Sequence, residues 1–192
     1  MTAPVRTVDH VQWGVADMWT GDADETEPSS TATLAEPSSG FTGIGYTAEG
    51  MAFSIETTTE EATVEEELLA VGEDTTGVVI TVTMAFAEDT FENRVLAIGN
   101  AELTTTAAGV GQIGKKKLTI VPGKKVISFV AMAKNGYGFK DRLYFPRMIA
   151  TGTVETSFRR RPSEKRLIPV TFKAIGSLDT ISMIQQTAAA TS

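Results

Sequence analysis

The 192-residue sequence contains no cysteine and a single histidine, His10. The lack of cysteine excludes disulfides, thiolate metal sites and thiol nucleophiles, and it leaves the redox compartment open. A Ser-His-Asp arrangement or a histidine-based zinc site would have to be built around His10, with carboxylates as the other metal ligands. The alternative role for His10 is that of an ordinary strand residue. We therefore expect no catalytic residue, no cofactor and no metal site, and we expect that the protein is not an enzyme.

Long apolar runs are also missing. No segment approaches the roughly twenty apolar residues of a membrane-spanning helix. Residues 1–21 lack the basic start and apolar run of a signal peptide. We expect no membrane insertion and no export by that route.

Charge, by contrast, is abundant and unevenly divided. Residues 1–100 hold nineteen acids and two bases, a net charge of −17, and residues 101–192 hold five acids and fifteen bases, a net charge of +10. The two halves sum to the net charge of −7 for the whole chain. Complementary surfaces on one molecule favour binding to further copies of it, head to tail or around a ring. The charge pattern therefore predicts self-assembly.

Two polar segments carry much of the acid. Residues 21–40 have Leu34 as their one large apolar residue, which predicts a loop or mobile excursion. Residues 56–76 hold eight acids and no base, which predicts either a solvated loop or a loop that docks on a basic surface. The C-terminal residues 187–192 are small and polar, which predicts a flexible tail.

Apolar periodicity predicts a mainly β chain. Residues 78–86 alternate large apolar and smaller side chains, the pattern of a central strand. A first strand is expected at residues 8–19, and two short strands at 41–47 and 51–57 should meet at a tight turn near Gly50. Further strands are expected at residues 117–121, 125–132, 143–150, 152–158, 166–175 and, more weakly, 179–184.

One helix stands out, at residues 89–98. Asp89 can cap its N-terminus, Phe91, Val95 and Ile98 share one face, and Gly99 follows where a C-terminal glycine is expected. The predicted fold is a single domain, residues 1–192, that forms an antiparallel β-sandwich or barrel of about seven to nine strands with this one flanking helix.

Two motifs suggest ligands but lack the required context. Residues 109–114 spell G-x-G-x-x-G, yet a strand rather than a helix is expected after Lys115, and Lys116 replaces the Ser or Thr of a phosphate-binding loop. We expect a flexible glycine loop there. Residues 22–27 hold four acids without the spacing of an EF-hand calcium loop.

The basic residues 159–166 have three possible roles: a solvated turn, a contact with the acidic surface of another copy, or a phosphate contact with nucleic acid. The net charge of −7 and the lack of interleaved aromatics disfavour nucleic acid. The candidate contacts between subunits are Glu60, Glu61, Glu65, Glu66, Glu67, Leu68, Leu69, Arg159, Arg160, Arg161, Lys165 and Arg166.

Several short motifs then occur in a familiar order within residues 41–175, with a weaker stretch at 104–117. The motifs are Gly43-Ile44-Gly45-Tyr46, Ile55-Glu56, the strand at 78–86, Glu88-Asp89-Thr90-Phe91-Glu92-Asn93, Leu96-Ala97-Ile98-Gly99, Leu143-Tyr144-Phe145-Pro146-Arg147 and Arg166-Leu167-Ile168-Pro169-Val170-Thr171-Phe172-Lys173-Ala174. In this order and spacing, the chain resembles the major tail tube proteins of bacteriophages with long, non-contractile tails.

This resemblance implies a β-sandwich whose copies close into hexameric rings, with the inner strands forming a continuous barrel. Rings stack into a tube around a tape-measure protein, and double-stranded DNA later passes transiently through an electronegative bore. The implied partners are the protein itself and the tape-measure, tail-terminator and distal tail proteins. The implied location is the virion tail, after synthesis in the cytoplasm of the bacterial host. In that family the long loop before the central strand reaches the adjacent ring, which makes residues 56–76 the stacking candidate.

A different function is compatible with the same fold class. A β-sandwich that serves as a receptor-binding or adhesion module of a virion or cell surface would be a stable monomer or small oligomer with exposed aromatics clustered at one end. Aromatic residues make up 7% of this chain and are scattered along it, which disfavours that alternative.

Overall fold

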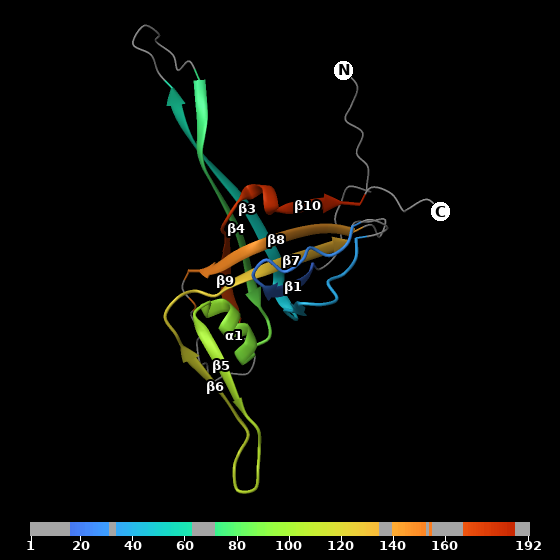
Figure 1. Ribbon diagram of the computed structural model, residues 1–192, viewed down its shortest axis with the longest axis vertical. Coiled ribbons are helices and arrows are strands. Elements are labelled where there is room, and N and C mark those ends of the chain that lie inside the picture. Colours follow the sequence, from blue (N-terminus) through green and yellow to red (C-terminus); the bar gives the residue numbers. More distant parts are fainter. Residues whose placement is uncertain are drawn as a thin grey trace, which may run out of the picture.

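The computed structural model describes residues 16–30, 34–62, 72–134, 140–152, 154 and 167–186. Within these residues the chain forms ten β-strands, one α-helix and a short 3-10 helix, η2 (Leu178–Thr180). The arrangement is shown in Figure 1. The predicted mainly β fold with one flanking helix is confirmed. No helix among the described residues is long and apolar enough to cross a membrane.

The strands form one large antiparallel sheet, which curls on itself, and one separate hairpin. The order in the large sheet is β2-β1-β7-β8-β9-β4-β3, and β10 also pairs with β8, while β5 and β6 form the hairpin. The strands are β1 (Asp17–Asp22), β2 (Phe41–Gly43), β3 (Thr47–Ala62), β4 (Gly72–Phe86), β5 (Ala101–Thr106), β6 (Lys115–Ile120), β7 (Val126–Lys134), β8 (Lys140–Thr151), β9 (Ile168–Ala174) and β10 (Ser182–Gln185).

Strand β8 explains how the sheet curls into two layers. Its first part pairs with β10, with Tyr144 opposite Ser182, and its last part pairs with β9, with Met148 opposite Ala174. Between these parts, at Phe145-Pro146-Arg147, the register with β7 shifts by one extra residue on β8. Such a bulge bends a strand. The aromatic-Pro-Arg step in the sequence therefore lies where β8 passes from one layer to the other.

The core fills the space between the layers. Strand β4 contributes Ile80, Val82, Met84 and Phe86, all buried, as its alternating pattern predicts. It lies between β3 and β9, so the predicted central strand is confirmed. The neighbouring strand β9 and strands β7 and β8 add buried apolar side chains to the same core, among them Phe129, Phe145, Met148, Ile168, Val170 and Phe172.

Helix α1 (Phe91–Ile98) packs beside β8 and β9 and leads into the β5–β6 hairpin. Its N-cap is Thr90, whose hydroxyl accepts a hydrogen bond from the Asn93 amide, so the prediction of Asp89 as the cap is wrong by one residue. Asp89 instead pairs with Arg94 at 2.6 Å. Gly99 ends the helix at φ 72°, and a Cβ there would lie 2.7 Å from the Cβ of Ala150.

Other predicted strands need correction. Gly50 does have a positive φ of 78°, but it lies within the continuous strand β3, at a register shift between Thr47 and Met51, and does not form a hairpin turn. Strand β8 ends at Thr151, so Gly152 and Val154 of the strand expected at 152–158 are not in a strand. Strand β5 was not anticipated. Most of the strand expected at 8–19 and all of the tail at 187–192 lie outside the described residues.

Candidate assembly surfaces

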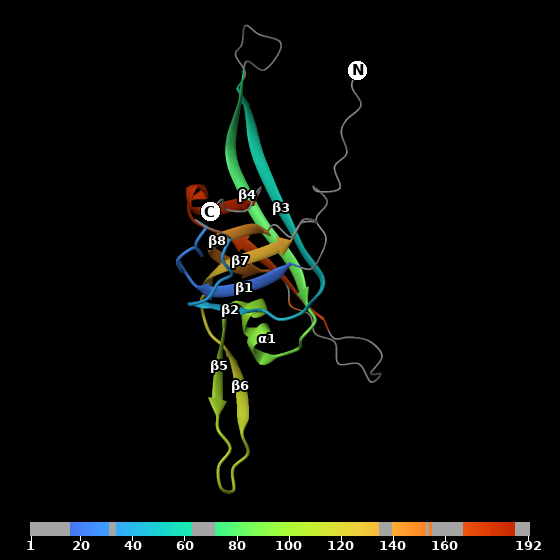
Figure 2. The same ribbon diagram turned by 90° about the vertical axis from the view of Figure 1, so that its right-hand side faces the viewer.

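Two hairpins project from opposite ends of the sandwich, and both views show them pointing away from each other (Figures 1 and 2). One is the outer part of β3 and β4, residues 54–62 and 72–77, which we call the acidic arm. The other is β5–β6 with its connecting residues 107–114, which we call the basic hairpin. Nearly all of the side chains described in the acidic arm are exposed, and so are those of residues 104–117 in the basic hairpin.

The acidic arm carries like charges directly opposite each other. Glu60 is the register partner of Asp74, and Glu61 that of Glu73. Like charges at facing positions of two strands repel. Among the described residues no base forms an ion pair with Glu56, Glu60, Glu73 or Asp74; the hydroxyl of Thr59 donates a hydrogen bond to Glu73. The arm therefore presents carboxylates that the described part of its own subunit does not neutralise.

The structure corrects the loop expected at residues 56–76, because residues 56–62 and 72–76 are strand. The run of threonines at 57–59 together with Thr75 and Thr76 explains the difference, since β-branched side chains favour extended backbone even where no apolar pattern exists. Glu60 is exposed on β3, and the backbone of Glu61 lies in the same strand. The other predicted contacts lie outside the described residues: Glu65, Glu66, Glu67, Leu68, Leu69, Arg159, Arg160, Arg161, Lys165 and Arg166.

The basic hairpin carries the G-x-G-x-x-G motif at its tip. Gly109 and Gln112 form a bridge across the turn, Gly111 has φ 74°, and strand β6 follows, so no helix N-terminus is available to hold a phosphate. The apolar tip residues Val110 and Ile113 are almost wholly exposed. Three consecutive lysines begin β6, and no acid occurs in residues 103–117.

Those three lysines point to two faces of the hairpin. Lys116 contacts Glu92 of helix α1, which lowers the pKa of that carboxyl through their hydrogen bond. Lys115 and Lys117 lie on the opposite face of the strand, next to Thr106 and Thr104 of β5. No ion pair joins them to any acid of the described residues. Sequence reasoning missed this pair, although the run Lys115-Lys116-Lys117 after a glycine loop was a visible signal.

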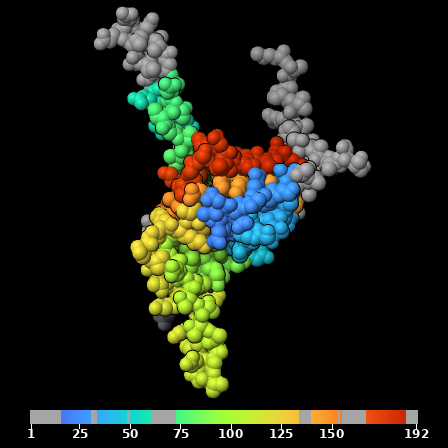
Figure 3. Space-filling model, viewed as in Figure 1, coloured from blue at the N-terminus to red at the C-terminus, as the bar shows by residue number. Residues whose placement is uncertain are grey.

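The described residues 23–30 and 34–40, which we call the loop, differ from the acidic arm, because they pack over the outer face of β1, β7 and β8 (Figure 3). Arg142 of β8 is buried and reaches into this loop: its guanidinium donates to Glu27 Oε1 at 2.9 Å, to the Ser29 carbonyl at 3.1 Å and to the Ala35 carbonyl at 3.4 Å. Of residues 21–40, predicted to be a loop or mobile excursion, Gly21 and Asp22 belong to β1, and the described residues 23–30 and 34–40 form a loop that Arg142 holds against the sheet.

Apolar contact also holds this loop. Leu34 is 3% exposed and packs with Val130, Met132 and Tyr144. The Tyr144 hydroxyl donates to the Glu25 carbonyl at 2.5 Å. Burial, and then the nearby carboxylates of Glu27, Asp24 and Glu25, raise the pKa of the Tyr144 phenol. The neutral phenol is therefore the form that fits this site.

Three of the four acids of residues 22–27 form ion pairs with bases of the sheet or its connections. Glu27 binds Arg142, while Asp22 lies 3.3 Å from Lys125 and Asp24 lies 3.5 Å from Arg147. Each acid comes from the first half of the chain and each base from the second. Part of the charge asymmetry is therefore used within one subunit. Among the described residues no group of three or more acids and histidines is placed to hold a metal ion.

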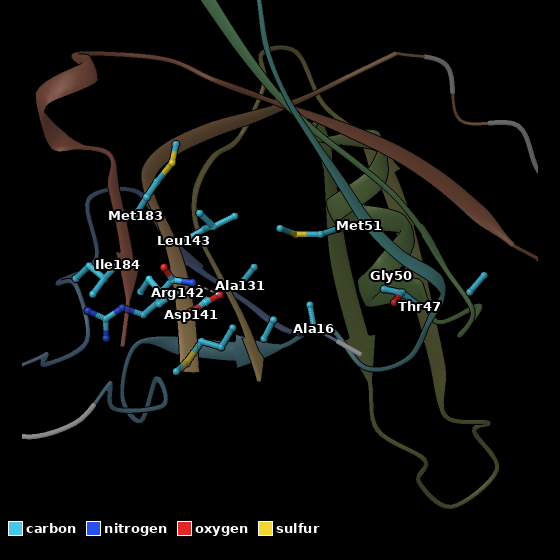
Figure 4. A pocket seen from close by; sticks show the side chains of 14 residues that line it. Ala16, Thr47, Gly50, Met51, Ala131, Asp141, Arg142, Leu143, Met183 and Ile184 are labelled. Atoms are coloured by element: carbon cyan, nitrogen blue, oxygen red, sulfur yellow. Dashed lines mark hydrogen bonds between the residues drawn. The ribbon is translucent and has the colours of Figure 1, made fainter. Parts of the chain in front are cut away.

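A cavity of about 690 Å³ opens between β3, β7, β8 and β10 (Figure 4). Side chains from all four strands line it, among them Met51, Ala131, Leu143, Met183 and Ile184. The lining is largely aliphatic, and its two charged residues are Asp141 and Arg142, the arginine whose two terminal nitrogens donate to the loop. The cavity offers apolar contact without a set of convergent polar groups.

Comparison of the chain with models of protein families finds no match, and comparison with curated protein sequences finds none either.

Proposed function

We propose that this protein is a structural subunit that assembles with copies of itself into stacked rings, forming the tail tube of a bacteriophage with a long, non-contractile tail. The observation that carries the proposal is the pair of exposed hairpins at opposite ends of the sandwich. A two-stranded ribbon without a packed face is marginally stable in water. Two such ribbons pointing in opposite directions suit a subunit that is packed from above and below.

Ring closure is supported by the edge of the sheet. Strand β3 spans sixteen residues and pairs with β4 on one side, while no strand among the described residues pairs with its other side. A long unpaired edge is a site for pairing with another chain. In a ring, this edge would take a strand of the neighbouring subunit, and closure would leave no free edge.

The outward face of β3, β4 and β9 supports the proposal that this sheet lines the bore of the tube. This face carries small or hydroxyl side chains such as Ser54, Thr81, Thr83 and Thr171, and the hydroxyls of Thr83 and Thr171 lie 3.5 Å apart. Lys173 of β9 is the one base among the described residues of this face, and a hydrated surface with so few phosphate contacts suits a duplex that must slide without adhering. The opposite layer is covered by residues 23–30 and 34–40 and would face outward.

Electron microscopy of the purified protein over a range of concentrations and salt tests the proposal. We expect rings with six-fold symmetry or tubes, growing longer as concentration rises. A monodisperse monomer at every concentration and salt level would contradict the proposal and favour the receptor-binding or adhesion module. Analytical ultracentrifugation of the same samples gives the oligomeric state independently of the grids.

A further inference from the structure

The two hairpins differ in charge as well as in direction. In the acidic arm, residues 54–62 and 72–77 hold Glu56, Glu60, Glu61, Glu73 and Asp74 and no base. In the basic hairpin, residues 103–117 hold three lysines and no acid. Copies stacked head to tail in the same orientation bring the arm end of one copy to the hairpin end of the next. The ends that meet are therefore opposite in charge.

On each hairpin, one face is available for such a contact. In the arm, Glu60 and Asp74 are register partners and so lie on one face. Their mutual repulsion is relieved when a base approaches that face. In the basic hairpin, Lys115 and Lys117 share the face opposite the one that Lys116 uses for Glu92. Each side thus supplies two exposed charges that lack an ion pair among the described residues.

Apolar contact is available as well. Val110 and Ile113 at the hairpin tip are exposed at 107% and 81%, and Ile55 on the arm is exposed at 50%. When a partner covers exposed aliphatic side chains at the end of a projecting ribbon, their burial stabilises the contact. The charges set the orientation of the contact, and these side chains add burial to it.

We infer that the basic hairpin of one subunit docks on the acidic arm of the subunit in the next ring, with Lys115 and Lys117 facing Glu60 and Asp74. The inference rests on the proposed tube function and names the surfaces through which rings stack. The partner is a second copy of this chain.

Charge reversal tests the contact. The variants are Lys115→Glu with Lys117→Glu, Glu60→Lys with Asp74→Lys, and all four changes in one chain. Each double reversal places like charges together, and we expect it to reduce the mean tube length about tenfold or more at low salt while rings still form. The fourfold variant restores opposite charges, so we expect it to recover tube length. Thermal unfolding of each variant checks that the monomer stays folded.

A second pair of variants probes the tip and provides a matched control. Val110→Ser with Ile113→Ser removes the apolar tip, and we expect shorter tubes at both low and high salt, because this part of the contact is not screened. Lys125→Gln removes an exposed base elsewhere, the partner of Asp22, and we expect tube length to stay as in the wild type.

The outcomes separate this inference from the proposed function. Tubes of normal length in both double-reversal variants, or failure of the fourfold variant to recover length while it remains folded, would overturn the docking of these two hairpins and leave the tube function standing. Absence of rings and tubes from the wild-type protein itself would overturn the tube function, and this inference with it.

Discussion

The loop at residues 23–30 and 34–40 and the acidic arm come from the same acidic half of the chain, yet they differ in whether their acids form ion pairs with bases of the same subunit. In the loop, Glu27 pairs with Arg142, Glu36 with Lys140 at 2.9 Å and Asp24 with Arg147. In the arm, Glu60 and Asp74 face each other with no base among the described residues to pair with them. Most acids of the first segment are paired with bases of the same subunit, and those of the second have no ion pair within the described residues.

The difference follows from what lies opposite each segment. The loop runs over strand β8, which carries Lys140, Arg142 and Arg147 within eight residues. The arm extends beyond the sandwich, so its strands face solvent on both sides. A high density of acid therefore predicts neither a mobile loop nor a docking surface by itself. The bases that the topology brings alongside decide which of the two it becomes.

The largest expected effect comes from removing the arginine that holds the loop. Arg142→Ala removes the donor to the Glu27 carboxylate and to the Ala35 carbonyl, leaves the Ser29 carbonyl with the Ala35 amide as its donor, and empties space in a fully buried position. Breaking a buried pair in this way costs about 3–5 kcal/mol, and the partial exposure of Glu27 places this case near the lower end, at about 3 kcal/mol. Urea unfolding measures the change, and limited proteolysis should show faster cleavage within the loop.

Arg147→Ala is the matched control for this variant. Its side chain is 48% exposed and its partner Asp24 is 62% exposed. Exposed pairs contribute about 0–1 kcal/mol, so the free energy of unfolding should change little. Equal effects of the two substitutions would mean that Arg142 does not hold the loop.

The contrast between the two segments also shows what the sequence could predict. Strand β4 and Gly99 were predicted correctly, because alternation of buried side chains and a positive φ after a helix are local patterns. The hydrogen bonds from Arg142 to the loop were not predicted, because Arg142 and Glu27 are 115 residues apart in sequence and only the folded sheet brings them together. Leu34 is a single apolar residue in a polar segment, so no periodicity marked it as buried.

The candidate assembly surfaces were predicted in part, for the same reason. Composition identified the high acid content of residues 56–76. The strands there were not predicted, because they are built from threonine and glutamate and show no periodic apolar pattern. The basic surface at the opposite end depends on the direction in which β5–β6 leaves helix α1. No local pattern in the sequence encodes that direction.

A smaller effect is expected at the tyrosine beneath the loop. Tyr144→Phe removes the hydrogen bond to the Glu25 carbonyl and should lower the free energy of unfolding by about 1 kcal/mol near neutral pH. Because the folded protein raises the pKa of Tyr144 above its usual 10.0, it holds the phenol proton more tightly than the unfolded chain does. Wild-type stability should therefore fall as pH rises above about 10, and the variant should lack this contribution to the loss.

Urea unfolding from neutral to alkaline pH measures both parts of this prediction. Tyr46→Phe serves as the control, because Tyr46 is 78% exposed and its hydroxyl makes no hydrogen bond within the described part of the chain. A wild-type profile that matches the Tyr144→Phe profile at high pH as well as near neutrality would mean that the phenol does not couple the loop to pH.

The smallest expected effect is that of Glu60→Gln in the acidic arm, and the same substitution at Glu27 in the loop should change the free energy of unfolding in the opposite direction. Glu60→Gln relieves the repulsion with Asp74 on the facing strand, so the free energy of unfolding of the monomer should rise by about 0.2–0.5 kcal/mol, less at high salt. The same change at Glu27 should lower it by about 1–3 kcal/mol, because the buried Arg142 then lacks a counter-charge. Urea unfolding below the assembly concentration measures both variants. If Glu60→Gln destabilised the monomer as Glu27→Gln does, the arm carboxylate would have a partner inside its own subunit, and it would not be free to receive the basic hairpin of another.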